Sequence, residues 1–352
     1  MGVSIISIIV SFCAGLFGTL IGALNAFIIF GLVLIFGIVL NIVSVMTGAV
    51  GYDWINQIAF GPYFAPFITF LGGAVAAMYA SKKGYIESGK QIEIPLITVG
   101  KVDVYCVGGL FGVIGYLFST YITTPFLGDK IDGGAFTIII ISLIAKFLFE
   151  GNVIGKVPEQ DKRLGGRFSL KVTNVWQPGQ RALWDKIFLG TAVGAVSGLA
   201  TYSMFTFGVN SYVAAYFGFA ISTFSLIYIN LGIPVTHHIS VCAGYAIVAL
   251  LLENPNLSVE VCLVWGIAFA ILATFLGDIL GSLFYVYGDS HIDPPGLAIM
   301  VVSFLAMYGI RTFRLYETGV VIPVIGIAAV VLFAAYRSLT VRKNNETVVN
   351  EI

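Results

Sequence analysis

Charged residues are scarce in this chain of 352 residues, and that scarcity decides its broad class. Only 10% of the residues are Asp, Glu, Lys or Arg, whereas 58% are hydrophobic and the mean hydropathy is +0.97. A soluble domain carries roughly 25% charged residues. The sequence therefore predicts an integral membrane protein, with the lipid bilayer as its main partner. The formal net charge is zero, so nothing indicates nucleic acid as a partner.

The chain also lacks the common motifs of catalysis and nucleotide binding. It contains no P-loop, no GxGxxG that opens a helix after a strand, no HExxH and no GxSxG. Cysteine is rare, and the four cysteines lie in apolar runs without a CxxC pair: Cys13, Cys106, Cys242 and Cys262. Small buried hydrophobic residues are the expected role for them. We therefore expect no enzyme, no cofactor and no metal site.

The apolar runs are continuous, which favours helices over the strands of a transmembrane barrel. Barrel strands alternate apolar and polar residues, whereas these runs extend over roughly 20 residues, the length of a membrane-spanning helix. We expect an all-α polytopic membrane protein with about eleven transmembrane helices. The first segment has no basic residues before it and is interpreted as a span, not as a removed signal peptide. The expected helices are 3–24, 26–47, 62–80, 103–126, 133–149, 185–207, 209–230, 234–253, 257–287, 294–310 and 319–338.

Basic residues predict the orientation of the chain. Most Lys and Arg residues fall in three segments: 81–102, 150–186 and the C-terminal tail. An even number of expected helices separates these segments, so they should share one side of the membrane. By the positive-inside rule that side is the cytoplasm, which places the N-terminus outside and the C-terminus inside a plasma membrane, such as the bacterial inner membrane. Arg311 and Arg314 are exceptions, because they fall in an outside loop.

A short acidic phrase occurs twice, as GDKID at 128–132 and as GDSHID at 288–293. When Asp132 is aligned with Asp293, the apolar pattern TIIIISLIAKF matches AIMVVSFLAMY without gaps. Upstream, GPYFAPFITFLGGA resembles GIPVTHHISVCAGY, and glycines further upstream match in the same order. Several features in one order indicate that the chain arose by duplication.

The duplication predicts the domain organisation. We expect a first transmembrane repeat at 1–150, a cytoplasmic linker at 151–184 with a short hairpin near 165–180, a second repeat at 185–310, and an additional helix with a cytoplasmic tail at 311–352. An odd number of spans in each five-helix repeat would insert the second copy upside down, the inverted-topology plan of many transporters. The two acidic phrases would then approach from opposite faces.

Asp132 and Asp293 are the leading candidate site residues. Asp before a helix start, with Pro following Asp293, is a strong N-cap signal, so both can be plain caps at the membrane surface. The helices that follow are short, however, and a helix that begins inside the membrane aims its positive end at a cavity. Both interpretations remain open at this stage. Asp129 and Asp289, in the same phrases, are candidates of the same kind.

Asp278 is a further candidate, because an acid at membrane depth is costly and is commonly functional. It lies between two glycines in FLGDILGS, a plausible break in the long expected helix 257–287. If that helix instead runs straight and tilted, Asp278 could reach the interface and have a structural role.

The three histidines of the chain, His237, His238 and His291, all fall in the second half. Histidine titrates near neutral pH, so these side chains could couple transport to protons, or could simply be polar residues at the interface. The stretches GPYFAP and PVTHHIS also suggest broken helices at corresponding places. Unwound backbone at membrane depth is tolerated only where it lines a cavity or is buried in protein.

These features predict a secondary transporter for a small molecule or ion. Its site would lie between two inverted repeats, with H⁺ or Na⁺ as candidate coupling ions. A passive channel for a small solute is the alternative, since inverted repeats build channels as well. A membrane-embedded enzyme or receptor-like protein fits less well, because the repeated acids are expected on opposite sides. A homo-oligomer is compatible with all of these.

Overall fold

The computed structural model describes residues 4–49 and 51–350, and its regular structure in that range is helical. The first half contains α1 (Ile5–Ile21), α2 (Ala23–Thr47), α3 (Thr69–Lys82), α4 (Val102–Phe118) and α6 (Gly133–Glu150). A π-helical turn, η1 (Ile55–Ala59), precedes α3, and α4 continues through η3 (Ser119–Thr123) into α5 (Thr124–Leu127).

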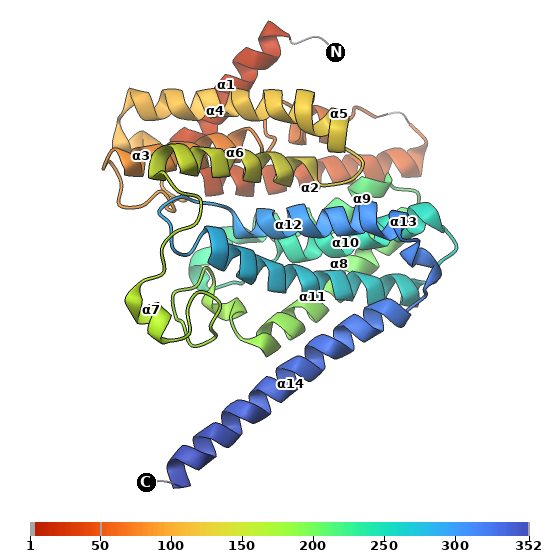
Figure 1. Cartoon of the computed structure of the whole chain (residues 1–352). Coiled ribbons are helices and arrows are strands. Elements are labelled where there is room, and N and C mark those ends of the chain that lie inside the picture. The colour runs from red at the N-terminus through yellow and green to blue at the C-terminus, as the bar shows by residue number, and fades with distance from the viewer. Residues whose placement is uncertain (1–3, 50, 351–352) are drawn as a thin grey trace.

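The second half has the same order of helices. It contains α8 (Leu183–Thr206), α9 (Ser211–Phe224) extended by η5 (Ser225–Leu231), α10 (His237–Glu253), α11 (Val259–Phe284) and α12 (Pro294–Phe304). The chain then continues through η6 (Leu305–Gly309), α13 (Ile310–Thr312) and η7 (Leu315–Glu317) to the last helix, α14 (Val321–Asn350). The two halves form two adjoining layers, and α14 extends away from them (Figure 1).

The linker between the halves is irregular. It holds only α7 (Glu159–Arg163) and a 3₁₀ turn, η4 (Pro178–Gln180). The expected hairpin near residues 165–180 is therefore wrong. The linker is instead fixed by Arg167, which donates to the carbonyl oxygens of Ser282 at 2.8 Å and Leu283 at 3.1 Å. These carbonyls end α11 and would otherwise lack partners.

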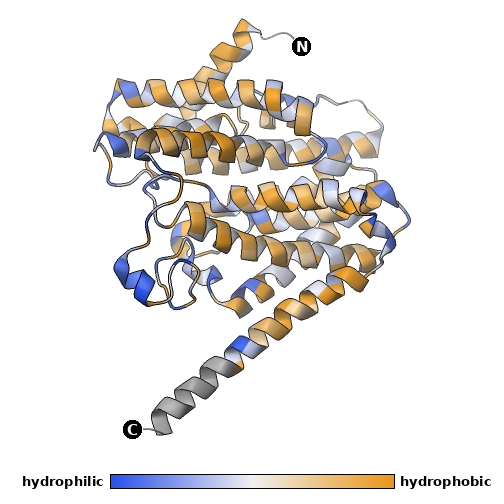
Figure 2. Ribbon diagram, viewed as in Figure 1, coloured by the Kyte–Doolittle hydropathy of each residue, from blue (hydrophilic) through white to orange (hydrophobic). Residues whose placement is uncertain are grey.

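The all-helical class is confirmed for the described residues, whereas the expected count of eleven spans is not confirmed. Eight described helices are long and apolar enough to cross a membrane. Hydrophobic residues cover most helical surfaces, while hydrophilic residues gather in α7 and the loops (Figure 2). The helices α1, α3 and α10 have 17, 14 and 17 residues. At ~1.5 Å per residue they reach about 21 to 26 Å, short of a ~30 Å hydrocarbon core.

The short helices α3 and α10 form the centre of the structure. In α10 every residue from His237 to Leu251 is buried, and α3 is buried over most of its length. Glycines permit this close packing: a Cβ on Gly18 of α1 would overlap the Thr69 carbonyl group, and one on Gly72 would approach the Gly108 oxygen to 2.6 Å. Small residues let helix backbones approach in the same way inside membranes.

Irregular segments precede both central helices. Residues 60–68 form turns, so α3 begins at Thr69, later than the expected start at residue 62. Residues 232–236 are likewise non-helical before α10. The carbonyl oxygens of Ala65 and Pro66 accept hydrogen bonds from the amides of Thr69 and Leu71 at 3.0 Å each, which anchors the turn to α3.

The helices α6 and α12 run antiparallel and pack against each other where the two layers meet (Figure 1). The backbone amide of Asp132, at the start of α6, donates to Ser303 Oγ near the end of α12 at 2.9 Å. The same contact fixes the start of α6 well inside the molecule. In contrast to expectation, α11 is continuous from Val259 to Phe284, without a break at Gly277–Gly281. Both glycines lie at close contacts: Gly277 lies against His238 and Trp176, and Gly281 lies against Pro294 and Trp176.

The basic loop 81–102, the linker and residues 284–293 meet at one end of the helices. Lys90 Nζ donates to the Val286 carbonyl at 2.8 Å, and an isolated bridge joins Gly89 to Ser290. The GDSHID phrase lies at this end. The GDKID phrase lies at the other end, between α5 and α6 (Figure 1).

Candidate functional site

Three adjoining cavities run between the two halves. The first cavity, of about 700 Å³, opens near GDKID, and the second, of about 560 Å³, opens near GDSHID. A central cavity of about 50 Å³ lies between them. It shares Phe60, Asp132, Gly134 and Tyr216 with the first cavity, and shares Phe27, Phe70, His237 and Asp293 with the second.

Asp132 lines the first and central cavities and caps α6. Its Oδ1 accepts from the Ala135 amide at 2.7 Å, and its Oδ2 accepts a short hydrogen bond from the Tyr245 hydroxyl. The expectation of an N-cap is confirmed here. The cap is not at a surface, however, because α12 and α10 cover it through Ser303 and Tyr245.

Asp293 occupies the corresponding position on α12. Its Oδ2 accepts a hydrogen bond from the backbone amide of Gly296, three residues further on, at 2.8 Å. Asp132 accepts in the same way from the amide of Ala135. Asp293 Oδ1 lies 3.5 Å from His291 Nε2. Asp293 lines the second and central cavities. The duplicated acids thus reach one small cavity from opposite sides, each at the positive end of a helix.

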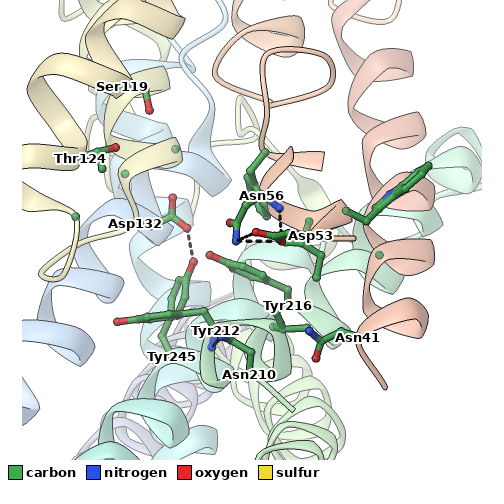
Figure 3. Close-up of a pocket in the computed structure, with 18 of the residues that line it drawn as sticks. Asn41, Asp53, Asn56, Ser119, Thr124, Asp132, Asn210, Tyr212, Tyr216 and Tyr245 are labelled. Carbon is green, nitrogen blue, oxygen red and sulfur yellow. Dashed lines mark hydrogen bonds between the residues drawn. The ribbon is translucent and has the colours of Figure 1, made fainter. Parts of the chain in front are cut away.

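The first cavity is polar and contains no Lys, Arg or His among its described lining residues. In Figure 3 the hydroxyls of Tyr216 and Tyr245 point toward Asp132, and Asn56 binds the Asp53 carboxylate at 2.9 Å. The further polar lining residues include Asn41, Ser44, Tyr52, Ser119, Thr124, Asn210 and Tyr212. Such a surface, with acids and neutral polar groups, suits cations and uncharged polar solutes better than anions.

The second cavity holds two histidines, His237 and His291, and one cation, Lys90. Lys90 Nζ lies 4.7 Å from the centre of the Tyr285 ring. Burial lowers the pKa of Lys90, with the nearby Lys146 acting in the same direction. Burial also raises the pKa of Tyr285 to about 12, so its hydroxyl stays protonated near neutral pH.

Asp278 lies outside all three cavities. Its Oδ2 is 2.7 Å from Lys186 Nζ, and its two carboxylate oxygens accept from Arg181 at 3.0 and 3.1 Å. Lys186 is 2% exposed and also donates to the Arg181 carbonyl at 2.8 Å. This buried ion triad joins the linker, α8 and α11. The structure therefore gives Asp278 a tethering role and does not bring it to the other candidate residues.

The remaining candidates also lie apart from the central cavity. Asp129 is exposed in the GDKID loop, and Asp289 binds Ser81 through a short hydrogen bond. His238 is buried beneath the Trp176 ring at a centroid distance of 6.0 Å. Within the described residues, no group of three or more His, Cys, Asp and Glu side chains could hold a metal ion.

The structure adds residues that the sequence reasoning missed. Tyr245 and Tyr216 lie beside Asp132, and phenylalanines from four segments surround the central cavity: Phe27, Phe60, Phe70 and Phe219. The sequence spacing could have indicated Tyr245. His237, Val241 and Tyr245 follow one another at intervals of four residues, so they share one face of α10. The phenylalanines carried no such signal among the many aromatic residues of the chain.

One family model matches the chain twice, over residues 2–165 and over residues 158–325. Its description is "Family of unknown function (DUF7973)". No curated protein and no solved structure matches the chain. Because the two matches together cover most of its length, the chain belongs to this family of unknown function, and each half of it corresponds to one family unit.

Proposed function

We propose that the protein is a secondary transporter for a small cation or uncharged polar solute, coupled to H⁺ or Na⁺. The observation that carries the proposal is the continuous series of cavities between the halves. Two large cavities open at opposite ends and share residues with one small central cavity that contains both duplicated acids. Transporters commonly place their site at the interface of two repeats, near the bilayer midplane and at helix ends.

We further propose that the halves are inverted-topology repeats. The double match to one family model and the antiparallel packing of α6 and α12 support this. The short buried helices α3 and α10, each preceded by irregular backbone, are a second corresponding pair. The basic loops at one end favour a cytoplasmic location for the second cavity under the positive-inside rule. The first cavity would then face outside.

The narrow centre favours a transporter over an open channel. The rings of Phe27 and Phe219 lie against the His237 ring at the junction of the second and central cavities. Their centroids lie 5.2 Å and 5.9 Å, respectively, from the centroid of the His237 ring. Aromatic rings at this junction would block free diffusion and would have to move for a solute to pass. A passive channel remains the second candidate, because the cavities are aligned in series.

Transport by reconstituted protein tests the proposal. Proteoliposomes on a solid-supported membrane would receive small monovalent cations and small neutral solutes one at a time, with and without a pH or Na⁺ gradient. We expect a saturable response that Asp132→Asn and Asp293→Asn each abolish. A response that does not saturate and ignores both gradients would favour the channel. Unchanged transport by both variants would reduce the two acids to helix caps.

A further inference from the structure

We infer that the coupling ion is the proton, and that it binds at His291, Asp293 and His237 on the side of the second cavity. This inference rests on the transport proposal above and specifies the chemistry of its site. The main observation is a set of buried imidazole nitrogens without hydrogen-bond partners, on residues that line the second and central cavities.

The first observation concerns the imidazole rings. His237 and His291 are 3% and 8% exposed, and both line the second cavity. Among the described residues, His237 Nδ1 and both ring nitrogens of His291 have no hydrogen-bond partner; the same holds for both ring nitrogens of His238, which lines none of the three cavities. Buried polar atoms are normally paired, and each exception calls for an explanation. Both residues line a cavity with space for water, although the unpartnered nitrogens themselves have almost no accessible surface.

The second observation is the order of these groups. His291 Nε2 lies 3.5 Å from Asp293 Oδ1, and Asp293 also lines the central cavity. His237 lines both cavities and lies between them. A proton accepted from a hydronium ion by the His291 imidazole releases water and forms an imidazolium with Asp293 as its counter-ion. Transfer to Asp293 Oδ1 restores the neutral imidazole and leaves a carboxylic acid facing the central cavity.

The third observation disfavours Na⁺. Transporters bind Na⁺ with unwound carbonyl oxygens and helix C-terminal ends. The central cavity is met by the N-terminal ends of α6, α10 and α12, and only Phe60 and Pro66 of the irregular segment 60–68 line it. Three of the four carboxylate oxygens of Asp132 and Asp293 already accept hydrogen bonds. A proton needs no such cage of oxygen ligands.

The charged and titratable neighbours of the two histidines are few. His291 faces Asp293 and the Tyr285 ring, whose centroid lies 5.3 Å away, and shares the second cavity with Lys90 and Glu93. His237 faces His238 at 5.8 Å between ring centroids. Asp293, Asp132 and Tyr216 share the central cavity with it. The acids around the rings outnumber the single lysine, so they offset part of the cost of burying an added positive charge.

The test measures proton binding directly, without knowledge of the solute. Full-length protein in proteoliposomes on a solid-supported membrane is exposed to a jump from about pH 8 to about pH 5, across the range of histidine titration. We expect a transient current that His237→Gln and His291→Gln each reduce several-fold. His238→Gln is the matched control, because His238 is equally buried but lines none of the three cavities, and it should keep the wild-type current.

A Na⁺ jump at constant pH completes the experiment. We expect no transient above that of protein-free liposomes. A Na⁺ transient that Asp293→Asn removes but that His237→Gln and His291→Gln leave unchanged would overturn the proton assignment while leaving the transport proposal standing. The proton assignment would also fall if the pH transient were absent, or unchanged in both His237→Gln and His291→Gln. Nuclear magnetic resonance of ¹⁵N-histidine, with only three histidines to assign, verifies in each variant that the remaining rings keep their wild-type signals.

Discussion

Asp132 and Asp293 cap two antiparallel helices and line one small cavity from its opposite sides. Each carboxylate accepts from the amide three residues further on, at 2.7 and 2.8 Å. The cap and the cavity lining are therefore properties of the same side chain, and the two interpretations that the sequence left open hold together. The negative charge of the carboxylate distinguishes the two roles experimentally. The side-chain amide of Asn can cap a helix but cannot carry a proton or balance a cation.

The Asn and Ala variants at positions 132 and 293 should differ in stability but not in transport. Asn is as good an N-cap as Asp, whereas loss of the cap in Asp132→Ala or Asp293→Ala should cost about 1 kcal/mol. All four variants should lose transport, since all four lose the carboxylate. Thermal unfolding in detergent and flux in proteoliposomes measure the two effects. Transport by the Asn variants would show that the charge is dispensable.

Asp278→Asn should destabilise the protein without removing transport. The substitution leaves Lys186 and Arg181 buried without their counter-charge, and breaking a buried ion pair in this way costs about 3 kcal/mol or more. A lowered unfolding temperature with normal flux per folded molecule is the expected result. Lost flux at an unchanged unfolding temperature would instead show that Asp278 takes part in transport.

Phe219→Ala should open the centre. The Phe219 ring lies against His237 and lines the central cavity, so its removal should join the second and central cavities and raise solute leak several-fold. Efflux from preloaded proteoliposomes measures this leak. Phe188→Ala, on an exposed face of α8 with 68% of Phe188 accessible, is the matched control and should not leak. Equal efflux from both variants would show that the Phe219 ring is not part of the barrier to the solute.

Gly115→Ala should disturb the irregular segment before α3. A Cβ at Gly115 would overlap the Phe67 carbonyl oxygen, and overpacking of this kind costs about 1–3 kcal/mol. Gly326→Ala in α14 meets nothing within 4 Å and should stabilise that helix by up to about 1 kcal/mol. Unfolding temperatures of the two variants should move in opposite directions. A shift of the same sign in both would contradict the packing of α4 on residues 60–68.

The sequence predicted those features that depend on local patterns. Continuous apolar runs located the helices, and Asp followed by a helix start located both caps, because these signals act within a few residues. The pairing of the two acidic phrases was also visible, since duplication leaves matching residues in order. The number of membrane spans was less certain, because α3 and α10 are apolar yet short, and burial inside protein and burial in lipid select similar residues.

Contacts between distant segments could not be predicted. The partners of Asp278 are Arg181 of the linker and Lys186 of α8, about a hundred residues earlier in the chain. No local sequence pattern indicates these contacts. The apparent break at Gly277–Gly281 was misleading for the same reason: these glycines serve close packing against Trp176 and Pro294 and do not interrupt α11. Likewise, the ring around the central cavity is assembled from α2, α3, α9 and residues before α3.

The most direct test of the central claim is the side from which each large cavity can be reached. Ala49 lines the first cavity and Gly179 the second; both are exposed, and a Cβ at Gly179 meets nothing within 4 Å. Ala49→Cys and Gly179→Cys would be made singly after replacement of the four native cysteines, and labelled with a membrane-impermeant thiol reagent in sealed vesicles of known orientation. We expect labelling of residue 49 only from outside and of residue 179 only from the cytoplasmic side. Labelling of both from the same side would contradict a transport path between two oppositely facing cavities.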